Sequence, residues 1–325
     1  MNVSDHFASF QSNLLPSDSA KAKATAHADY VKRLLENDRW LQPTDVLYSG
    51  SFAKSTHIAP LRDIDVVVHY PREDWLNGQG KLRDPARVIG EFRQRLDQAL
   101  GHAVRVRPQR RSVGVLYADV KLDLVPAMLL DESGLAEIPD RVERRWIKTD
   151  IRAHIDFIRR RDPSYRPIAN TVRLMKAWKR HRSVRIPGFA LELIVVKALE
   201  KAGTSASLQE CVFRVFNYIT RGRLEQPVTF NSNYRIRDIR VNHNDPLVVV
   251  DPVNETNNVA HEVTDDELAA FLSKCDRDWR NARLGREAED RGDHALAVRH
   301  WRAVFGGDFA TLPRKEKSIW DRIFA

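Results

Sequence analysis

Cysteine is scarce in this chain, which has only Cys211 and Cys275 among 325 residues. Two distant thiols are too few for a disulfide framework or a four-thiolate zinc site. Any bound metal ion would therefore be held by oxygen or imidazole ligands.

Long apolar runs are also absent. No stretch of about 18 apolar residues occurs, and the amino terminus lacks the charged-then-apolar pattern of a secretory signal. We therefore expect no membrane association and a cytoplasmic location. Hydrophobic residues make up 42% and charged residues 30% of the sequence, proportions that exclude wholesale disorder and fibrous classes.

Negative charge is in the minority, because 44 acidic residues face 53 lysines and arginines and leave a net charge of +9. A basic balance favours polyanionic partners such as nucleotides, nucleic acid or anionic lipid, although an ordinary basic surface gives the same figure. The stretch with Arg105, Arg107, Arg110 and Arg111 is accordingly either a nucleic-acid patch or a solvated charged hairpin.

Hydrophobic periodicity predicts a mixed first half and a helical second half. In the first half we expect helices over 18–38 and 85–100, and strands over 46–48, 63–69, 103–107 and 113–125. In the second half we expect helices over 151–161, 168–182, 187–202 and 208–219, with weaker ones from residue 264 onward. The change of pattern divides the chain into residues 1–150 and 151–325.

An acidic pair, Asp63 and Asp65, flanks Ile64 in a predicted strand. Alternate residues of a strand point to one face, so the two carboxylates lie side by side while Ile64 enters the core. Carboxylates that close repel each other unless a cation lies between them. A hard divalent ion that also binds nucleotide phosphates is the natural neutraliser.

A two-metal site needs a third acid, and the predicted strand over 113–125 offers Asp119 and Asp123 on one face. Asp123 is preferred because it lies between two leucines just before the strand ends at a cleft. Asp119 lies close to Lys121 and can face solvent instead.

The segment before the acidic pair suits phosphate. Gly50 lets the backbone approach an anion, Ser51 and Thr56 carry hydroxyl donors, and Lys54 adds a cation. The amides of a short helix beginning near Ser51 would point at the phosphates. A lone Gly-Ser pair is weak evidence, but one followed by a strand-borne Asp-x-Asp is far more specific.

The predicted helix over 168–182 has a basic stripe. At about 100° per residue, Arg173, Lys176 and Arg180 share one side and apolar residues such as Trp178 take the other. Such a stripe is either a solvated face or a phosphate-binding wall, and the acidic pair favours the second. The next helix is apolar nearly all round, so its Glu192 is expected to pair internally.

Five ordered motifs carry a family resemblance. They are GSFAKST at 50–56, PLRDID at 60–65, LDLVP at 122–126, RLMKAWK at 173–179 leading to GFALEL at 188–193, and DPVNETNNVA at 251–260. Together they resemble the signature of the polymerase-beta-like nucleotidyltransferases. Within them the chain most resembles the bacterial cGAS/DncV-like (CD-NTase) oligonucleotide synthases, which are related to the oligoadenylate synthetases. Gly188 and Glu255 depart from the family pattern, which often has Ser and Pro there.

The resemblance implies a bilobal α+β fold, with a nucleotidyltransferase core of mixed sheet and helices over 1–150 and an oligoadenylate-synthetase-like helical lobe over 151–325. It implies that Asp63, Asp65 and Asp123 are catalytic and hold two Mg²⁺ ions, with Mn²⁺ as an alternative. Lys176, with Lys179 as the second choice, would bind the donor triphosphate. For Asn258, contact with a nucleotide and bracing of the cleft both remain open.

The implied activity joins NTPs, ATP among them, into a cyclic di- or trinucleotide with release of pyrophosphate. That product is a second messenger of anti-phage (CBASS) defence, read by a separate effector, and the implied regulators are RNA or an accessory protein. Two alternatives are kept: a nucleotidyltransferase that modifies an RNA 3′ end or a protein, and a non-catalytic nucleotide- or RNA-binding module.

Overall fold

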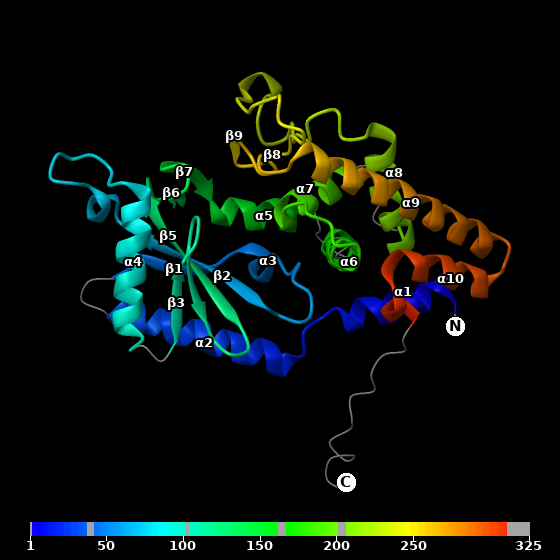
Figure 1. Cartoon of the computed structure of the whole chain (residues 1–325), viewed down its shortest axis with the longest axis horizontal. Coiled ribbons are helices and arrows are strands. Elements are labelled where there is room, and N and C mark those ends of the chain that lie inside the picture. Colours follow the sequence, from blue (N-terminus) through cyan, green and yellow to red (C-terminus); the bar gives the residue numbers. More distant parts are fainter. Residues whose placement is uncertain (1, 38–41, 102–103, 162–166, 201–205, 311–325) are drawn as a thin grey trace, which may run out of the picture.

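The computed structural model describes residues 2–37, 42–101, 104–161, 167–200 and 206–310. Its first lobe is built on a mixed sheet, to which the described residues contribute seven strands (Figure 1). They are β1 (Asp45–Tyr48), β2 (Asp63–Tyr70), β3 (Arg105–Pro108), β4 (Val113–Leu116), β5 (Lys121–Leu129), β6 (Leu135–Asp140) and β7 (Arg145–Asp150). The order is β1-β2-β5-β4-β3, and β6 with β7 extends from β5.

Two long helices, α2 (Asp18–Asn37) and α4 (Pro85–Ala99), pack against one face of this sheet. The alternation of β2 explains which face: Ile64, Val66 and Val68 join the core under the helices. Val67 points the other way and packs against Ala127. Asp63 and Asp65 alternate with the core residues in the same way as Val67. The acidic pair therefore lies on the face of the sheet away from α2 and α4.

The prediction of a single strand over 113–125 is wrong. The segment forms two antiparallel strands, β4 and β5, joined by a turn in which the Tyr117 amide donates to the Val120 carbonyl at 3.0 Å. The apolar alternation breaks at the polar residues of this turn. Asp119 therefore lies on the turn and Asp123 lies in β5, so they do not share a strand face.

The second lobe is helical, as predicted. Its long helices are α5 (Ile151–Arg161), α6 (Pro167–His181), α7 (Gly188–Leu199), α8 (Leu208–Gly222), α9 (Asp265–Asp290) and α10 (His294–Phe305). A small hairpin of β8 (Val250–Asp251) and β9 (Asn254–Asn258) lies between α8 and α9 in the chain. Short helical turns are α3 (Gly50–Ala53), η1 (Arg72–Trp75), η2 (Ile236–Asp238) and η3 (Gly307–Ala310). The predicted ends of two helices, at residues 38 and 202, and the predicted start of one strand, at residue 103, lie outside the described residues.

The first helix, α1 (Val3–Asn13), has no counterpart in the sequence expectations. It packs on the far end of the chain, where the Phe7 ring meets the rings of Trp301 and Phe309 edge-on at 4.9 Å. The amino terminus thus joins the core of the helical lobe, while the division of the chain at residue 150 stays a prediction. Among the described residues, no helix is both long and apolar enough to cross a membrane.

The contact of α1 with the helical lobe yields a stability prediction. Phe7→Ala should lower the free energy of unfolding by roughly 3–5 kcal/mol, because Phe7 is 1% exposed and its ring fills a site between α1 and α10. Ser12→Ala, on the exposed side of the same helix, should change it by less than about 0.5 kcal/mol. Chemical denaturation measures both, and a loss from Phe7→Ala as small as that from the control would show that α1 is not part of this core.

Candidate active site

The three acids meet because β2 and β5 are parallel neighbours. Their register pairs Asp65 with Asp123, and Asp63 comes two residues earlier on the same face as Asp65. Asp63 is exposed at the edge, whereas Asp123 is 8% exposed. The predicted side-by-side arrangement of the carboxylates is confirmed, and the preference for Asp123 over Asp119 agrees with their positions, since Asp119 pairs with His27 of α2 at 3.2 Å.

The phosphate loop (residues 49–56) presses against Asp65. Gly50 has φ +57°, and a Cβ atom added to it would lie 1.8 Å from Oδ2 of Asp65. Only glycine fits this close approach and this backbone conformation. The predicted short helix is present as α3, which starts at Gly50 after Ser49.

Burial and the neighbouring carboxylates change the pKa of Asp65. Burial, then the carboxylates of Asp123 and Asp63, raise the pKa of Asp65 to about 6, against the opposing effect of Lys54 and Lys121. Asp123 is already compensated, because Lys121 pairs with its Oδ2 at 2.7 Å and the Gln109 side chain donates to its Oδ1.

These residues fit a hard divalent cation. Crowded carboxylates are neutralised by such an ion, and oxygen is the ligand that Mg²⁺ and Mn²⁺ prefer. As the side chains stand, no group of three or more His, Cys, Asp or Glu in the described part of the chain is arranged to hold a metal ion. Lys121 and Gln109 take up the oxygens of Asp123 instead.

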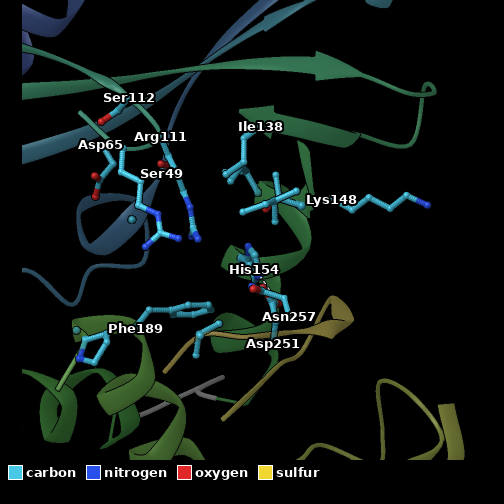
Figure 2. Close-up of a pocket in the computed structure, with 18 of the residues that line it drawn as sticks. Ser49, Asp65, Arg111, Ser112, Ile138, Lys148, His154, Phe189, Asp251 and Asn257 are labelled. Carbon is cyan, nitrogen blue, oxygen red and sulfur yellow. Dashed lines mark hydrogen bonds and ion pairs between the residues drawn. The ribbon is translucent and has the colours of Figure 1, made fainter. Parts of the chain in front are cut away.

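Two cavities flank the acids. The larger, of about 560 Å³, is lined by Asp65 and by Ser49, Gly50 and Lys54 of the phosphate loop. Figure 2 shows Ser49 and Asp65 on one side of it. The smaller, of about 460 Å³, is lined by Asp63 together with Ser51, Lys176, Lys179 and Arg180. Most of the predicted site residues are therefore divided between two cavities, whereas Asp123, Thr56 and Asn258 line neither.

The basic stripe of α6 is present in part. Lys176 and Arg180 line the smaller cavity with Lys179, and burial, then the charge of Lys176, lowers the pKa of Lys179. Arg173, expected on the same stripe, is 4% exposed and donates to Asn170 at 2.5 Å. Arg173 is therefore buried in the helical lobe and does not line the cavity, so the basic stripe is narrower than predicted.

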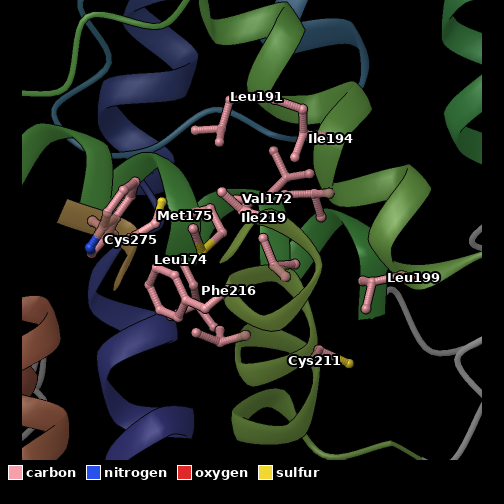
Figure 3. Packing of buried hydrophobic residues seen from close by; sticks show 14 of the residues in the cluster. Val172, Leu174, Met175, Leu191, Ile194, Leu199, Cys211, Phe216, Ile219 and Cys275 are labelled. Carbon is pink, nitrogen blue, oxygen red and sulfur yellow. The ribbon is translucent and has the colours of Figure 1, made fainter. Parts of the chain in front are cut away.

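A buried carboxylate pairs with one lysine from each of the two cavities. Glu192 lies on α7, whose residues Leu191 and Ile194 belong to the apolar core of Figure 3, and it is 2% exposed. Its oxygens meet Nζ of Lys54 at 2.5 Å and Nζ of Lys176 at 2.6 Å. Burial alone would raise the pKa of Glu192, but the two lysines outweigh it and lower that pKa to about 2. The expected internal pairing of Glu192 is confirmed.

Two residues that were predicted to contact the nucleotide bond instead to groups of the protein itself. Thr56 is fully buried and its hydroxyl donates to Glu192 at 2.8 Å, so it does not face a phosphate. Asn258 donates to Asp245 and to the Leu247 carbonyl, and accepts from the Val249 and Ala260 amides. The bracing interpretation therefore fits Asn258.

The sequence reasoning missed part of the larger cavity. His154, Phe189 and Asn257, which it did not single out, line this cavity together with Asp251, for which bracing of the cleft and contact with a nucleobase were both open. Asn257 belongs to the motif that contains Asn258, but strand alternation puts the two on opposite faces, and the sequence does not reveal which one faces the cleft. Figure 2 shows Asp251, Asn257 and His154 grouped across the cavity from Asp65.

The arginine-rich stretch is divided as well. Arg110 and Arg111 line the larger cavity and both pair with the fully buried Asp140, at 2.7 and 2.9 Å. Arg105 and Arg107 are exposed on β3. The stretch is therefore not one open patch for nucleic acid.

The Glu192 cluster gives a stability prediction. Glu192→Gln should lower the free energy of unfolding by about 3 kcal/mol, because two buried ammonium groups lose their anion. Replacing Glu192 with Gln together with Lys54→Met and Lys176→Met should recover most of that loss. The control Glu200→Gln removes the exposed partner of Lys197 and should cost less than about 0.5 kcal/mol. Equal losses in Glu192→Gln and the control, by chemical denaturation, would contradict the assignment.

Comparison with known proteins agrees with this geometry. A family model described as Second Messenger Oligonucleotide or Dinucleotide Synthetase domain matches residues 1–162. The chain is 29% identical over 279 residues, 80% of this chain and 82% of the relative, to a cyclic AMP-AMP-AMP synthase of Escherichia coli strain MS 115-1. It is 26% identical over 289 residues, 86% of each chain, to a CBASS oligonucleotide cyclase CdnC of E. coli strain KTE188.

Structural similarity extends over nearly the whole chain. The solved structure of E. coli MS115-1 CdnC with ATP is 25% identical, with a TM-score of 0.77 over 96% of this chain and 99% of that one. The predicted bilobal α+β fold is thereby confirmed. With its synthetase domain, these relatives and this fold, the chain belongs to the bacterial cGAS/DncV-like nucleotidyltransferases, the CD-NTases.

Proposed function

We propose that the chain joins nucleoside triphosphates, with release of pyrophosphate, into a cyclic oligonucleotide second messenger of CBASS defence. The observation that carries the proposal is the meeting of three carboxylates on β2 and β5, with Asp65 lining one cavity and Asp63 lining a second, each of a size that holds a small ligand. Two cavities beside one acidic edge suit a reaction in which one nucleotide attacks another.

ATP is the substrate that the relatives favour. One relative is named a cyclic AMP-AMP-AMP synthase, and a structural neighbour was solved with ATP. These names support a product that contains adenylate. A structural neighbour was solved as a CdnC:HORMA-deltaN complex, which favours an accessory protein over RNA as the regulator. The cytoplasm is the expected location.

Asp63, Asp65 and Asp123 would hold two Mg²⁺ ions, with Mn²⁺ as an alternative. When bound, such ions neutralise triphosphate charge and increase the acidity of the attacking hydroxyl. The ammonium groups of Lys54 and Lys176 face phosphates from the two cavities. Little covalent work is required of the protein, since positioning and electrostatic stabilisation carry the reaction.

Proton transfer is assigned to Asp123. Its carboxylate would accept the proton of the attacking hydroxyl as that oxygen approaches the α-phosphorus and pyrophosphate leaves. Lys121 pairs with Oδ2 of Asp123 at 2.7 Å and so holds this carboxylate in place.

Asp65→Asn should reduce pyrophosphate release from NTPs at least about a hundredfold, because it removes a central charge of the cation site. Asp119→Asn is the matched control: that acid lies on the β4–β5 turn beside His27, and its loss should leave the rate unchanged. Enzyme-coupled detection of pyrophosphate in the presence of Mg²⁺ measures both variants. Full activity of Asp65→Asn, with its circular dichroism unchanged, would refute the site.

A further inference from the structure

The larger cavity has a charged end and an apolar end, and Phe189 connects them. Nζ of Lys54 lies 4.2 Å from the centre of the Phe189 ring, and the His154 ring stands edge-on to it at 5.1 Å. Isoleucines of the sheet and of α5 complete the apolar walls: Ile138, Ile147, Ile151 and Ile155. The end with Lys54 and the acids suits a triphosphate. The end with the Phe189 and His154 rings then suits the flat nucleobase of the same nucleotide.

At this apolar end, Asp251 is held by three donors. Oδ1 accepts from Nε2 of His154 at 2.7 Å and from the Val253 amide at 3.0 Å, and Oδ2 accepts from Nδ2 of Asn257 at 3.0 Å. Asp251 is 3% exposed, so these bonds fix it firmly.

The carboxylate determines how Asn257 is turned. A carboxylate accepts hydrogen bonds and donates none, so the amide of Asn257 must direct its NH₂ group to Asp251. The amide oxygen is then left over. Within the part of the chain that the structure describes, no protein donor reaches this oxygen, although Asn257 lines the cavity. A group that donates a hydrogen bond is therefore the ligand that this position accepts.

We propose that Asn257, locked by Asp251, reads the exocyclic amino group of an adenine base in this cavity; the inference rests on the proposed function. Adenine carries an amino donor at position 6, where hypoxanthine and guanine carry a carbonyl acceptor. An acceptor opposite the Asn257 oxygen leaves both groups without a partner in a partly dry site. The cavity thus selects ATP over ITP and GTP.

Calorimetric titration with ATP and with ITP tests the proposal, since the two bases differ only at position 6, where amino becomes carbonyl, and at the adjacent N1, which gains a proton. The wild type should bind ATP about tenfold more tightly than ITP, the value of one well-placed hydrogen bond. Asn257→Ala should bring the two affinities within about twofold of each other. Because Asn257 does not line the smaller cavity, the contribution of that cavity for a given nucleotide is the same in wild type and variant.

Asp251→Asn gives the sharper result. The oxygen that accepts from His154 and Val253 keeps its role, so the new NH₂ group at position 251 points to Asn257 and turns its amide around. The cavity then presents a donor, and the preference should invert towards ITP. A role of Asp251 in folding alone would weaken both nucleotides equally and not invert their order.

Thr256→Ala, on the opposite face of β9, is the matched control and should keep the wild-type ratio. An unchanged ATP to ITP ratio in Asn257→Ala, equal binding of the two nucleotides by the wild type, or loss of both nucleotides in Asp251→Asn would each overturn the base reading. None of these results touches pyrophosphate release by the wild type. Conversely, a wild type that distinguishes ATP from ITP but releases no pyrophosphate would contradict only the proposed function.

Discussion

Repulsion among three carboxylates is the constraint on which the rest of this structure depends. Asp65 and Asp123 are paired across two parallel strands, and both strands continue into an apolar core that prevents the acids from moving apart. Burial, then the charges of Asp123 and Asp63, raise the pKa of Asp65 to about 6. A site of this kind favours a divalent cation and a polyphosphate that it can bind together.

Glu192 extends this electrostatic arrangement between the lobes. It is carried by α7 of the helical lobe, yet it holds Lys54 of the phosphate loop as well as Lys176 of α6. The geometry of the phosphate loop beside Asp65 is therefore linked to the packing of the two lobes. The two lysines share one anion while facing different cavities, so the charge of each cavity depends on the same buried carboxylate.

Local patterns predicted the parts of the site that depend on local rules. Strand alternation is enough to place Asp63 and Asp65 on one face, whereas the close approach of Gly50 to Asp65 depends on how the loop packs against β2. The internal use of Thr56 could not be predicted, because its partner Glu192 is 136 positions away. Asn257 was missed in favour of Asn258 because alternation fixes relative faces and not which face meets the cleft. Likewise α1 has few apolar residues, and only the aromatic cluster at the far end of the chain explains its packing.

The net charge of +9 does not describe the active site, because acidic and basic groups alternate within a few ångströms there. Mass spectrometry of the products that the chain makes from the four NTPs with Mg²⁺ tests the account most directly. The account predicts a phosphatase-resistant cyclic oligonucleotide that contains AMP and forms without any added acceptor. A product that appears only when RNA or protein is supplied as acceptor would contradict it.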